Sequence, residues 1–492
     1  MSIELGAYSE EAEEFLSSID REYYLHYSGQ QDEFEIEPIY DRHAGLFSRD
    51  SVESLREAAA APALVEFAVQ GHIGQELKSG SAELARREAA LELEWEGEKV
   101  PYRSAPVLQA NERDPDRRAA LEDARNDLMA SELNPLTHEL LERSHELARE
   151  LGWQSMRDLC QELSGTDLGA LAQQTERFLA DTDDSYERLV EPEVREQVGL
   201  GFDRLRRSDL TAFFRAPGLD DGFPEERLVP SLTDTLGGMG IDVASQHGVV
   251  IDTERRPKKS PRAFCAPVRV PDEVYLVIAP VGGREDFAAL FHEAGHTEHY
   301  AHVDPALPVE DRYLGDNSVT EGFAFLFEHL TSDPEWLRRR LGIEEPEPIV
   351  SHERAARMVF LRRYAAKLAY ELELHGGGSI EGLDSLYARR LSEAVHVDWP
   401  SVSWLSDVDP FFYVVRYLRA WALETHLRSA LRERFGGAWF EEPEAGAFLR
   451  ELWSAGQGAA GAEGILERVG GGPLDFGAVL AEVCEHNGPT PS

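Results

Sequence analysis

The sequence predicts a mainly α-helical fold that carries one small β element. Along most of its 492 residues, apolar side chains recur at helical spacing between breaks of Gly and Pro. Strand-type runs are confined to residues 248–280. The hydrophobic content of 42% is ample for one large or two ordinary domains in a chain of this length.

The first half of the chain is predicted to consist of helices with solvated acidic faces. These helices span residues 9–27, 51–69, 81–96, 116–131, 135–151, 153–163 and 167–180. A further short helix is predicted over 192–198, with Pro192 at the favourable first position. We expect this N-terminal helical half, residues 1–235, to pack against a second half formed by residues 236–492.

The predicted β element lies just after this boundary. Apolar runs at 248–252, 263–271 and 273–280 are joined by short polar links. The run at 273–280 is the best strand candidate, because it is rich in β-branched residues. Pro280 closes that run, which favours an edge position in the sheet.

A helix that carries two histidines follows the last strand. Phe287, Leu290 and Phe291 lie at helical spacing and predict a buried stripe. His292 and His296 are four residues apart, so both imidazoles leave one face of the helix and can share a zinc ion. The helix also contains Glu293 and Gly295. A carboxylate beside the first ligand can take a proton from water that the metal activates. A glycine between two ligands often lets another backbone come close.

Zinc in a catalytic site needs a third protein ligand and leaves its fourth position to water. Glu321 lies in the first turn of the next predicted helix, residues 316–330. It opens an otherwise apolar helix, and a buried carboxylate needs a partner, which favours the role of ligand. The alternative is a solvated carboxylate favoured by the helix dipole. Glu328 lies on nearly the same face and could orient His292 or His296.

Residues 248–330 resemble the thimet oligopeptidase and oligoendopeptidase F superfamily of zinc metallopeptidases. In that superfamily a stretch like Gly-Ala-Phe-Cys precedes the strand and the histidine helix. This chain has Arg262 in place of the glycine, followed by Ala263, Phe264 and Cys265. The spacing of the third ligand and of the glutamate after it also matches, as does a third histidine, at His299.

The resemblance implies a helical zincin-type metallopeptidase fold with the small β element next to the metal helix. It implies one Zn²⁺ held by His292, His296 and Glu321, with Glu293 as the catalytic base. The substrates would be short unfolded peptides, which enter a cleft or channel between the two halves of the chain. Residues 236–492 would then be the catalytic half. The strand at 274–279 would hold the peptide extended across the metal by main-chain pairing.

Residues 409–421 are similar to a second stretch of oligoendopeptidase F, whose tyrosines hydrogen-bond the developing oxyanion. The resemblance implies this catalytic role for Tyr413 or Tyr417. The middle tyrosine of the family is Val415 here, and Asp407 and Asp409 stand where the family has a histidine. The alternative is that both tyrosines pack in the core. Helices are predicted over 333–341, 351–374, 380–395 and 411–435, and breaks at 217–224, 237–240, 376–378 and 455–474.

The sequence therefore predicts a zinc-dependent peptidase of the oligoendopeptidase type, with two alternatives. A carboxypeptidase Taq-like metallocarboxypeptidase shares the helices and the ligand spacing, and residues 416–424 are loosely similar to that family. The stretch from Ala263 to Cys265 favours the endopeptidase. A non-catalytic metal-binding helical protein is the other alternative. Glu293 argues against it, because a structural zinc site fills its fourth position and has no use for a base.

Composition limits the partners and the compartment. The net charge is −43, from 92 acidic and 49 basic residues, which disfavours nucleic acid and anionic membranes. Three cysteines are too few for a disulfide framework. The first residues lack the features of a signal peptide, and no apolar run is long enough to span a bilayer. We therefore expect a cytoplasmic protein.

The acidic surface predicts that salt stabilises the fold, as in proteins of salt-loving hosts. Salt shortens the Debye length from about 30 Å at 0.01 M to about 3 Å at 1 M, which screens the repulsion between exposed carboxylates. We expect the melting temperature to rise over this range and activity to persist in molar salt. A melting temperature that is flat or falls between the two concentrations would rule out the halophilic character.

Overall fold

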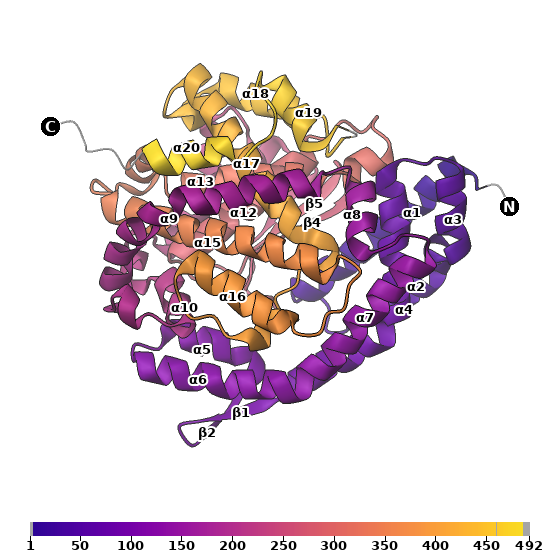
Figure 1. The fold of residues 1–492 in the computed structure, drawn as a ribbon. Helices are drawn as coiled ribbons and strands as arrows, with labels where there is room; N and C mark the ends of the chain where they lie inside the picture. Colours follow the sequence, from indigo (N-terminus) through magenta and orange to yellow (C-terminus); the bar gives the residue numbers. More distant parts are fainter. Residues whose placement is uncertain (1–2, 459, 486–492) are drawn as a thin grey trace. The chain divides into compact units, whose positions relative to one another are not determined.

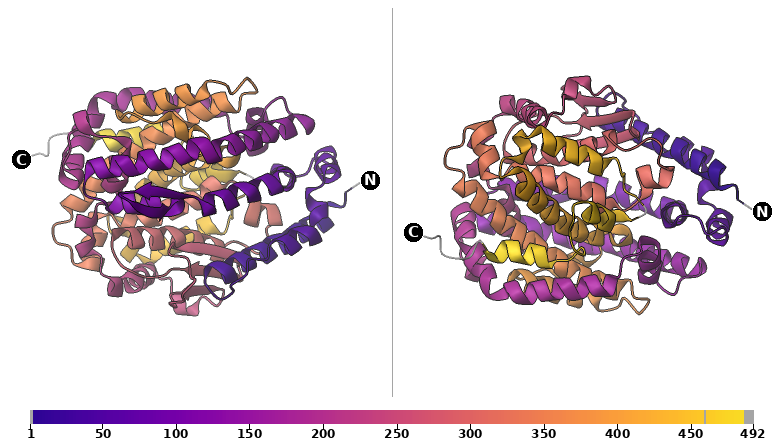
Figure 2. Two further views of the ribbon diagram at one scale, coloured as in Figure 1. Left: turned by 90° about the horizontal axis from the view of Figure 1, so that it is seen from below. Right: turned by 90° about the horizontal axis from the view of Figure 1, so that it is seen from above.

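The structure is a computed structural model that describes residues 3–458 and 460–485, without the side chains of the last two residues. These residues are mainly helical and contain two small sheets (Figure 1 and Figure 2). The predicted mainly α fold with a small β element is confirmed. Within the described residues, every helix is too short or too polar to traverse a bilayer.

The chain divides into two compact units, each built from separate stretches. The first unit consists of Met1–Val69, Leu219–Val350 and Arg419–Val479. Its elements are α1 (Leu5–Tyr27), α2 (Glu37–Arg42), α3 (Arg49–Glu57), α11 (Glu225–Gly238), β3 (Val249–Asp252), β4 (Phe264–Arg269), β5 (Glu273–Val277), α12 (Arg284–Ala301), α13 (Asn317–Leu330), α14 (Pro334–Trp336), α18 (Pro443–Trp453) and α19 (Gly461–Arg468).

The second unit consists of Gln70–Gly218, Ser351–Leu418 and Leu480–Ser492. Its elements are β1 (Glu92–Trp95), β2 (Glu98–Pro101), α5 (Ala105–Asn111), α6 (Pro115–Leu128), α7 (Asn134–Glu150), α8 (Met156–Ser164), α9 (Leu168–Val198), α10 (Arg207–Arg215) and α16 (Leu383–Val395). Residues of both units occur in α4 (Pro62–Ala90), α15 (Glu347–Leu374), α17 (Tyr413–Phe435) and α20 (Gly477–Glu485). The division into halves at residue 235 stays a prediction.

The sheet beside the histidine helix has the strand order β3-β5-β4. β3 pairs with β5 in parallel, and β4 pairs with β5 in antiparallel orientation. The prediction that residues 273–280 form an edge strand is therefore wrong. Pro280 lies beyond the end of β5 and takes no part in the ladder, so it does not mark an edge. β5 is central, and it buries apolar side chains on both faces, Leu276 on one and Val277 on the other.

Most helices lie where the periodicity predicts them, and two of the predicted ones are interrupted. The helix predicted over 51–69 breaks after Glu57, and α4 begins at Pro62, a residue that favours the first turn of a helix. The helix predicted over 81–96 ends at Ala90. Glu96 and Gly97 follow with positive φ angles of 56° and 83°, which turn the chain into the β1–β2 hairpin.

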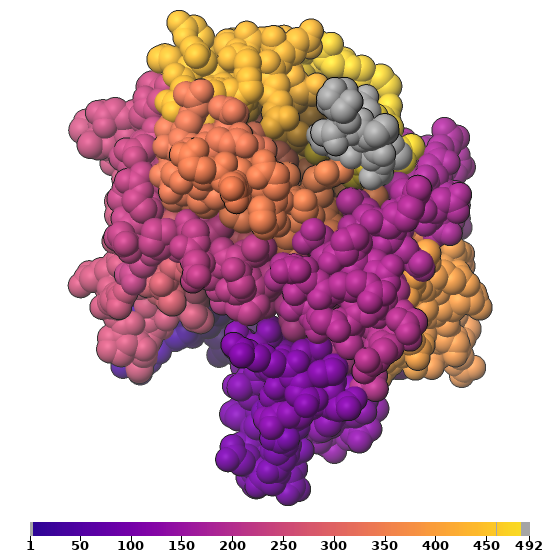
Figure 3. Space-filling view, turned by 90° about the vertical axis from the view of Figure 1, so that its left-hand side faces the viewer, coloured from indigo at the N-terminus to yellow at the C-terminus, as the bar shows by residue number. Residues whose placement is uncertain are grey.

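The other differences between the predicted and the observed helices arise at proline and glycine residues. Pro192 lies inside α9 and does not begin a separate helix. The helices α10, α11, α18, α19 and α20 were not predicted, since Pro and Gly within or beside them resemble breaks. Close packing explains one of these glycines. A Cβ on Gly446 of α18 would lie 1.9 Å from the carbonyl oxygen of Met239, at the end of α11. Figure 3 shows the yellow C-terminal residues beside pink residues from the middle of the chain.

The core of the first unit lies against the histidine helix. Phe287, Leu290 and Phe291 are fully buried, which confirms the predicted stripe. They share one hydrophobic cluster with Leu276 and Ile278 of the β5 segment and with the apolar face of α13. On the other face of the sheet, Tyr24 of α1 stacks on Tyr275 with ring centroids 3.7 Å apart. The sheet and α13 therefore hold α12 from two sides.

Gly295 lets α12 and α13 approach each other closely. A Cβ at this position would lie 2.5 Å from the carbonyl oxygen of Phe323 and 2.6 Å from the Cα of Ala324. Both are backbone atoms, so a side chain here can be accommodated only if one helix moves. The close backbone approach predicted at Gly295 is confirmed.

We expect Gly295→Ala to destabilise the fold by about 1–3 kcal/mol, the usual cost of overpacking a core. Denaturant unfolding measures this cost. Gly74→Ala is the matched control, because Gly74 lies on an exposed face of α4 with nothing within 4 Å of its added Cβ. That change should be neutral or stabilising by up to about 1 kcal/mol. Equal effects of the two changes would contradict the close packing of α12 on α13.

Candidate metal centre

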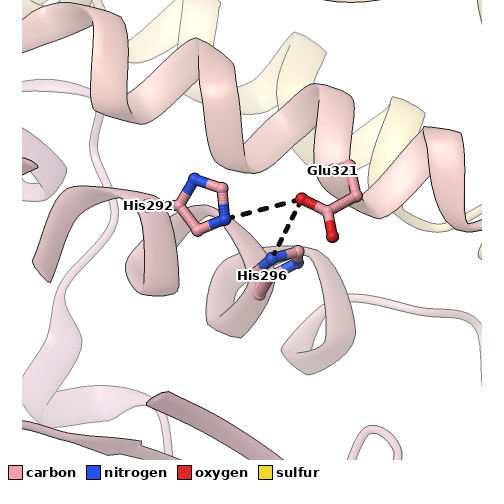
Figure 4. A group of neighbouring side chains, drawn as sticks. All are labelled: His292, His296 and Glu321. Carbon is pink, nitrogen blue, oxygen red and sulfur yellow. Dashed lines mark ion pairs between the residues drawn. The ribbon is translucent and has the colours of Figure 1, made fainter. Parts of the chain in front are cut away.

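Three side chains converge at the contact between α12 and α13. One ligand atom from each of His292, His296 and Glu321 lies within 4.8 Å of the others, so the group could hold a metal ion. The Oε2 atom of Glu321 is 3.5 Å from Nε2 of His292 and 3.7 Å from Nε2 of His296 (Figure 4). Two imidazoles and one carboxylate form the donor set of catalytic zinc sites that keep a position open.

The remaining ring nitrogens of both histidines are hydrogen-bonded. Nδ1 of His292 lies 2.7 Å from Oε2 of Glu328, and Nδ1 of His296 lies 2.8 Å from Oγ1 of Thr320. These contacts turn both Nε2 atoms toward Glu321. Such outer partners fix the tautomer and orientation of ligating histidines. The residues present therefore fit a metal ion, and Glu328 has the orienting position that the sequence suggested.

Charge and burial give the two histidines opposite electrostatic character. Burial opposes a charged His292, but the bonds to Glu321 and Glu328 outweigh it and raise its pKa well above the ordinary value. Burial, together with the charge of His292, lowers the pKa of His296 to about 4, although the charge of Glu321 raises it. His296 is therefore a neutral imidazole, the form that binds metals.

Glu293 is positioned by the β4 edge of the sheet. Its Oε2 accepts a hydrogen bond of 2.8 Å from the backbone N–H of Cys265 in β4. Burial raises the pKa of Glu293 to about 7, although the nearby His292 and the Cys265 N–H both lower it. The carboxyl group is thus held beside the three ligands and poised to exchange a proton near neutral pH.

The other residues singled out in the sequence lie elsewhere. His299 is fully buried and stacks on Tyr300, and burial lowers its pKa to about 3. Glu298 is buried and accepts a bond of 2.7 Å from Nε2 of Gln246. Neither belongs to the three-ligand group.

Tyr413 and Tyr417 lie on α17 and contact each other edge to face, with ring centroids 5.0 Å apart. Both rings are partly exposed, whereas Val415 between them is buried. The tyrosines belong to the second unit and the three ligands to the first. Their role at an oxyanion stays a prediction. Asp407 pairs with the buried Lys367 at 3.7 Å, so it has a structural partner in the second unit.

Sequence reasoning missed two contributors to this centre. One is the Cys265 N–H, which is a backbone group and leaves no trace in residue type. The other is Thr320, whose position directly before Glu321 was the only signal available. Its contact with His296 depends on how α13 packs against α12.

Comparison with known proteins supports the fold. No family model matches the chain, and no curated protein matches it in sequence. Among solved structures, a protein of Bacillus anthracis str. Ames provisionally named oligoendopeptidase F matches with a TM-score of 0.64 and 15% sequence identity. The match covers 96% of this chain and 89% of that one. The resemblance predicted from the sequence is confirmed for the fold, and the chain has an oligoendopeptidase F-like, mainly α architecture.

Proposed function

We propose that this protein is a zinc-dependent peptidase that hydrolyses short unfolded peptides. The convergence of His292, His296 and Glu321 beside a buried, hydrogen-bonded Glu293 is the observation that carries the proposal. The likeness to a structure named oligoendopeptidase F supports the same reaction class. A purely structural metal site would not need the carboxyl group of Glu293.

The residues divide the chemistry between them. His292, His296 and Glu321 would hold the zinc ion, which when bound polarises a carbonyl group and acidifies water. Glu293 takes the proton of the attacking water and passes it to the leaving amine. The Cys265 N–H keeps the Glu293 carboxylate in one orientation between these two transfers. A phenol of Tyr413 or Tyr417 would stabilise the oxyanion.

The peptide would be held extended along β4, which replaces the strand predicted from the sequence. β5 is paired on both sides, so it has no free edge for a further strand. β4 is an edge strand of this sheet, and its Cys265 contacts Glu293. An extended peptide can pair with an edge strand main chain to main chain.

Mass spectrometry of a mixed peptide library tests this function. We expect cleavage that a chelator abolishes and added zinc restores. Peptides with an amidated C-terminus should still be cut, because an endopeptidase does not need the free carboxylate. Cleavage restricted to free C-termini would favour the carboxypeptidase. Absence of any cleavage by the zinc-loaded protein would refute the proposal.

A further inference from the structure

Phe325 lies on the face of α13 that carries the third ligand. It follows Glu321 by four residues and precedes Glu328 by three, so the three side chains leave the helix on one side. The ring of Phe325 contacts the imidazole of His292 edge to face, with ring centroids 5.2 Å apart. A large apolar side chain therefore lies directly beside one of the three candidate metal ligands.

The ring of Phe325 lies outside the hydrophobic cluster that packs around the histidine helix. Phe323 and Phe327, two residues before and after it, are fully buried and belong to that cluster. Phe325 is partly exposed and is not a member of the cluster. Residues two apart on a helix do not face the same way, so the three phenylalanines divide between the core and the metal site.

Trp421 of α17 extends this apolar surface. Its indole stacks on Phe325, with ring centroids 5.3 Å apart and an angle of 24° between the planes. Trp421 is also partly exposed and outside the cluster, whereas Leu423 belongs to it. A Cβ on Gly322 would lie 2.8 Å from Cδ2 of Leu423, so α13 and α17 pack closely beside the two rings. Both helices therefore hold the stack in place.

The carboxylates near the stack already have partners. Glu321 faces the two histidines, and Glu328 contacts Nδ1 of His292. Glu293 accepts the N–H of Cys265. A ligand that reaches the stack therefore meets mainly aromatic surface. A side chain that is both large and apolar gains most from such contact.

A peptide bound for hydrolysis brings its side chains close to these rings. The carbonyl group that the metal polarises belongs to the scissile bond, and the two Cα atoms that flank this bond are about 3.8 Å apart. The ring of Phe325 is 5.2 Å from the ring of the ligand His292. A side chain next to the scissile bond is therefore within reach of the stack.

We propose that Phe325 and Trp421 form an apolar subsite of the metal centre, which takes an aromatic side chain next to the scissile bond. The inference rests on the proposed function and deepens it, because it names the class of peptide that the site prefers. The two rings contact the substrate side chain and take no part in proton transfer. Peptides with an aromatic residue beside the scissile bond are expected to be the best substrates.

Two hydroxamates test the subsite without hydrolysis. Phenylalanine hydroxamate and alanine hydroxamate bind a zinc ion through the same group and differ only in the side chain. We expect calorimetric titration of the zinc-loaded protein to show tighter binding of the phenylalanine compound. Trp421→Ala should reduce the ratio of the two affinities by about 2- to 10-fold, the usual contribution of one aromatic contact. Phe325→Ala should act similarly, and its zinc content is measured as well because Phe325 contacts His292.

Phe360→Ala is the matched control. Phe360 is also an aromatic residue open to solvent, and it stacks on Phe214 with ring centroids 4.4 Å apart, but both lie in the second unit. The affinity ratio should stay at the native value in this variant. Equal affinities of the native protein for the two hydroxamates would overturn the subsite. An unchanged ratio in a zinc-loaded Trp421→Ala variant would overturn it as well.

Cleavage of a matched peptide set gives the second readout. We expect kcat/KM to be higher for peptides with Phe beside the scissile bond than for the same peptides with Ala or Arg there. This preference should fall in Trp421→Ala. A preference for Arg would show that the carboxylates select the side chain, and it would overturn the apolar subsite. A zinc-loaded protein that binds both hydroxamates but cleaves no peptide refutes only the proposed function.

Discussion

Glu293→Gln is expected to reduce peptide hydrolysis by about 10²- to 10⁴-fold, the contribution of a positioned acid–base group. The amide has nearly the shape of the carboxylate, so it can still accept the Cys265 N–H bond of 2.8 Å. It cannot take a proton from water. The fold and the zinc content should therefore stay as they are, while kcat falls. Steady-state kinetics with a peptide that the native protein cleaves, together with elemental analysis, measure both quantities.

Glu298→Gln is the control for that substitution. Glu298 lies on the same helix and is buried, but its carboxylate bonds Gln246 and lies outside the ligand group. We expect its turnover to stay close to the native value. Near-normal turnover by a zinc-loaded Glu293→Gln variant would exclude Glu293 as the base. A large loss in both variants would point to a structural cause.

The local patterns of the sequence predict the centre well because they are patterns of single helices. The spacing of His292 and His296 fixes their common face, and the apolar stripe fixes which side of α12 is buried. The glycine at position 295 predicts that another backbone lies close to α12. Glu321 was identified because a carboxylate that opens an apolar helix needs a partner. Each of these inferences uses only neighbours along the chain.

The contributions that the sequence did not predict are all set by contacts between distant segments. The order β3-β5-β4 depends on which strands pair, and pairing between strands cannot be deduced from composition. The proline at position 280 therefore led to the wrong prediction that residues 273–280 form an edge strand. The sequence predicts a helix that begins at Pro192, because nothing local distinguishes a proline at a helix start from one inside α9. Thr320 of α13 contacts His296 of α12, so this hydrogen bond appears only in the folded chain.

Replacement of the ligands is expected to remove the metal. His292→Ala, His296→Ala and Glu321→Ala each take away one of the three donor atoms that converge within 4.8 Å. The loss of zinc affinity should be larger than the loss of about 10- to 100-fold that is usual when a residue that hydrogen-bonds a ligand is replaced. Elemental analysis after dialysis against a weak chelator should find little zinc in all three variants, and peptide hydrolysis should fall with the zinc content.

Glu321→Ala is the most informative of the three variants, because the sequence left a solvated carboxylate at the start of the helix as the alternative for this residue. Glu328→Gln is its matched control. Glu328 is also a carboxylate of α13, but it contacts Nδ1 of His292 at 2.7 Å. It therefore orients this histidine and does not face the metal position. We therefore expect zinc loss in the order Glu321→Ala, then Glu328→Gln, then native protein. Full zinc occupancy in Glu321→Ala would show that the third ligand is misassigned, and Glu328 would be the next candidate. A reversed order would make Glu328 the ligand, with Glu321 as the residue that orients the histidines.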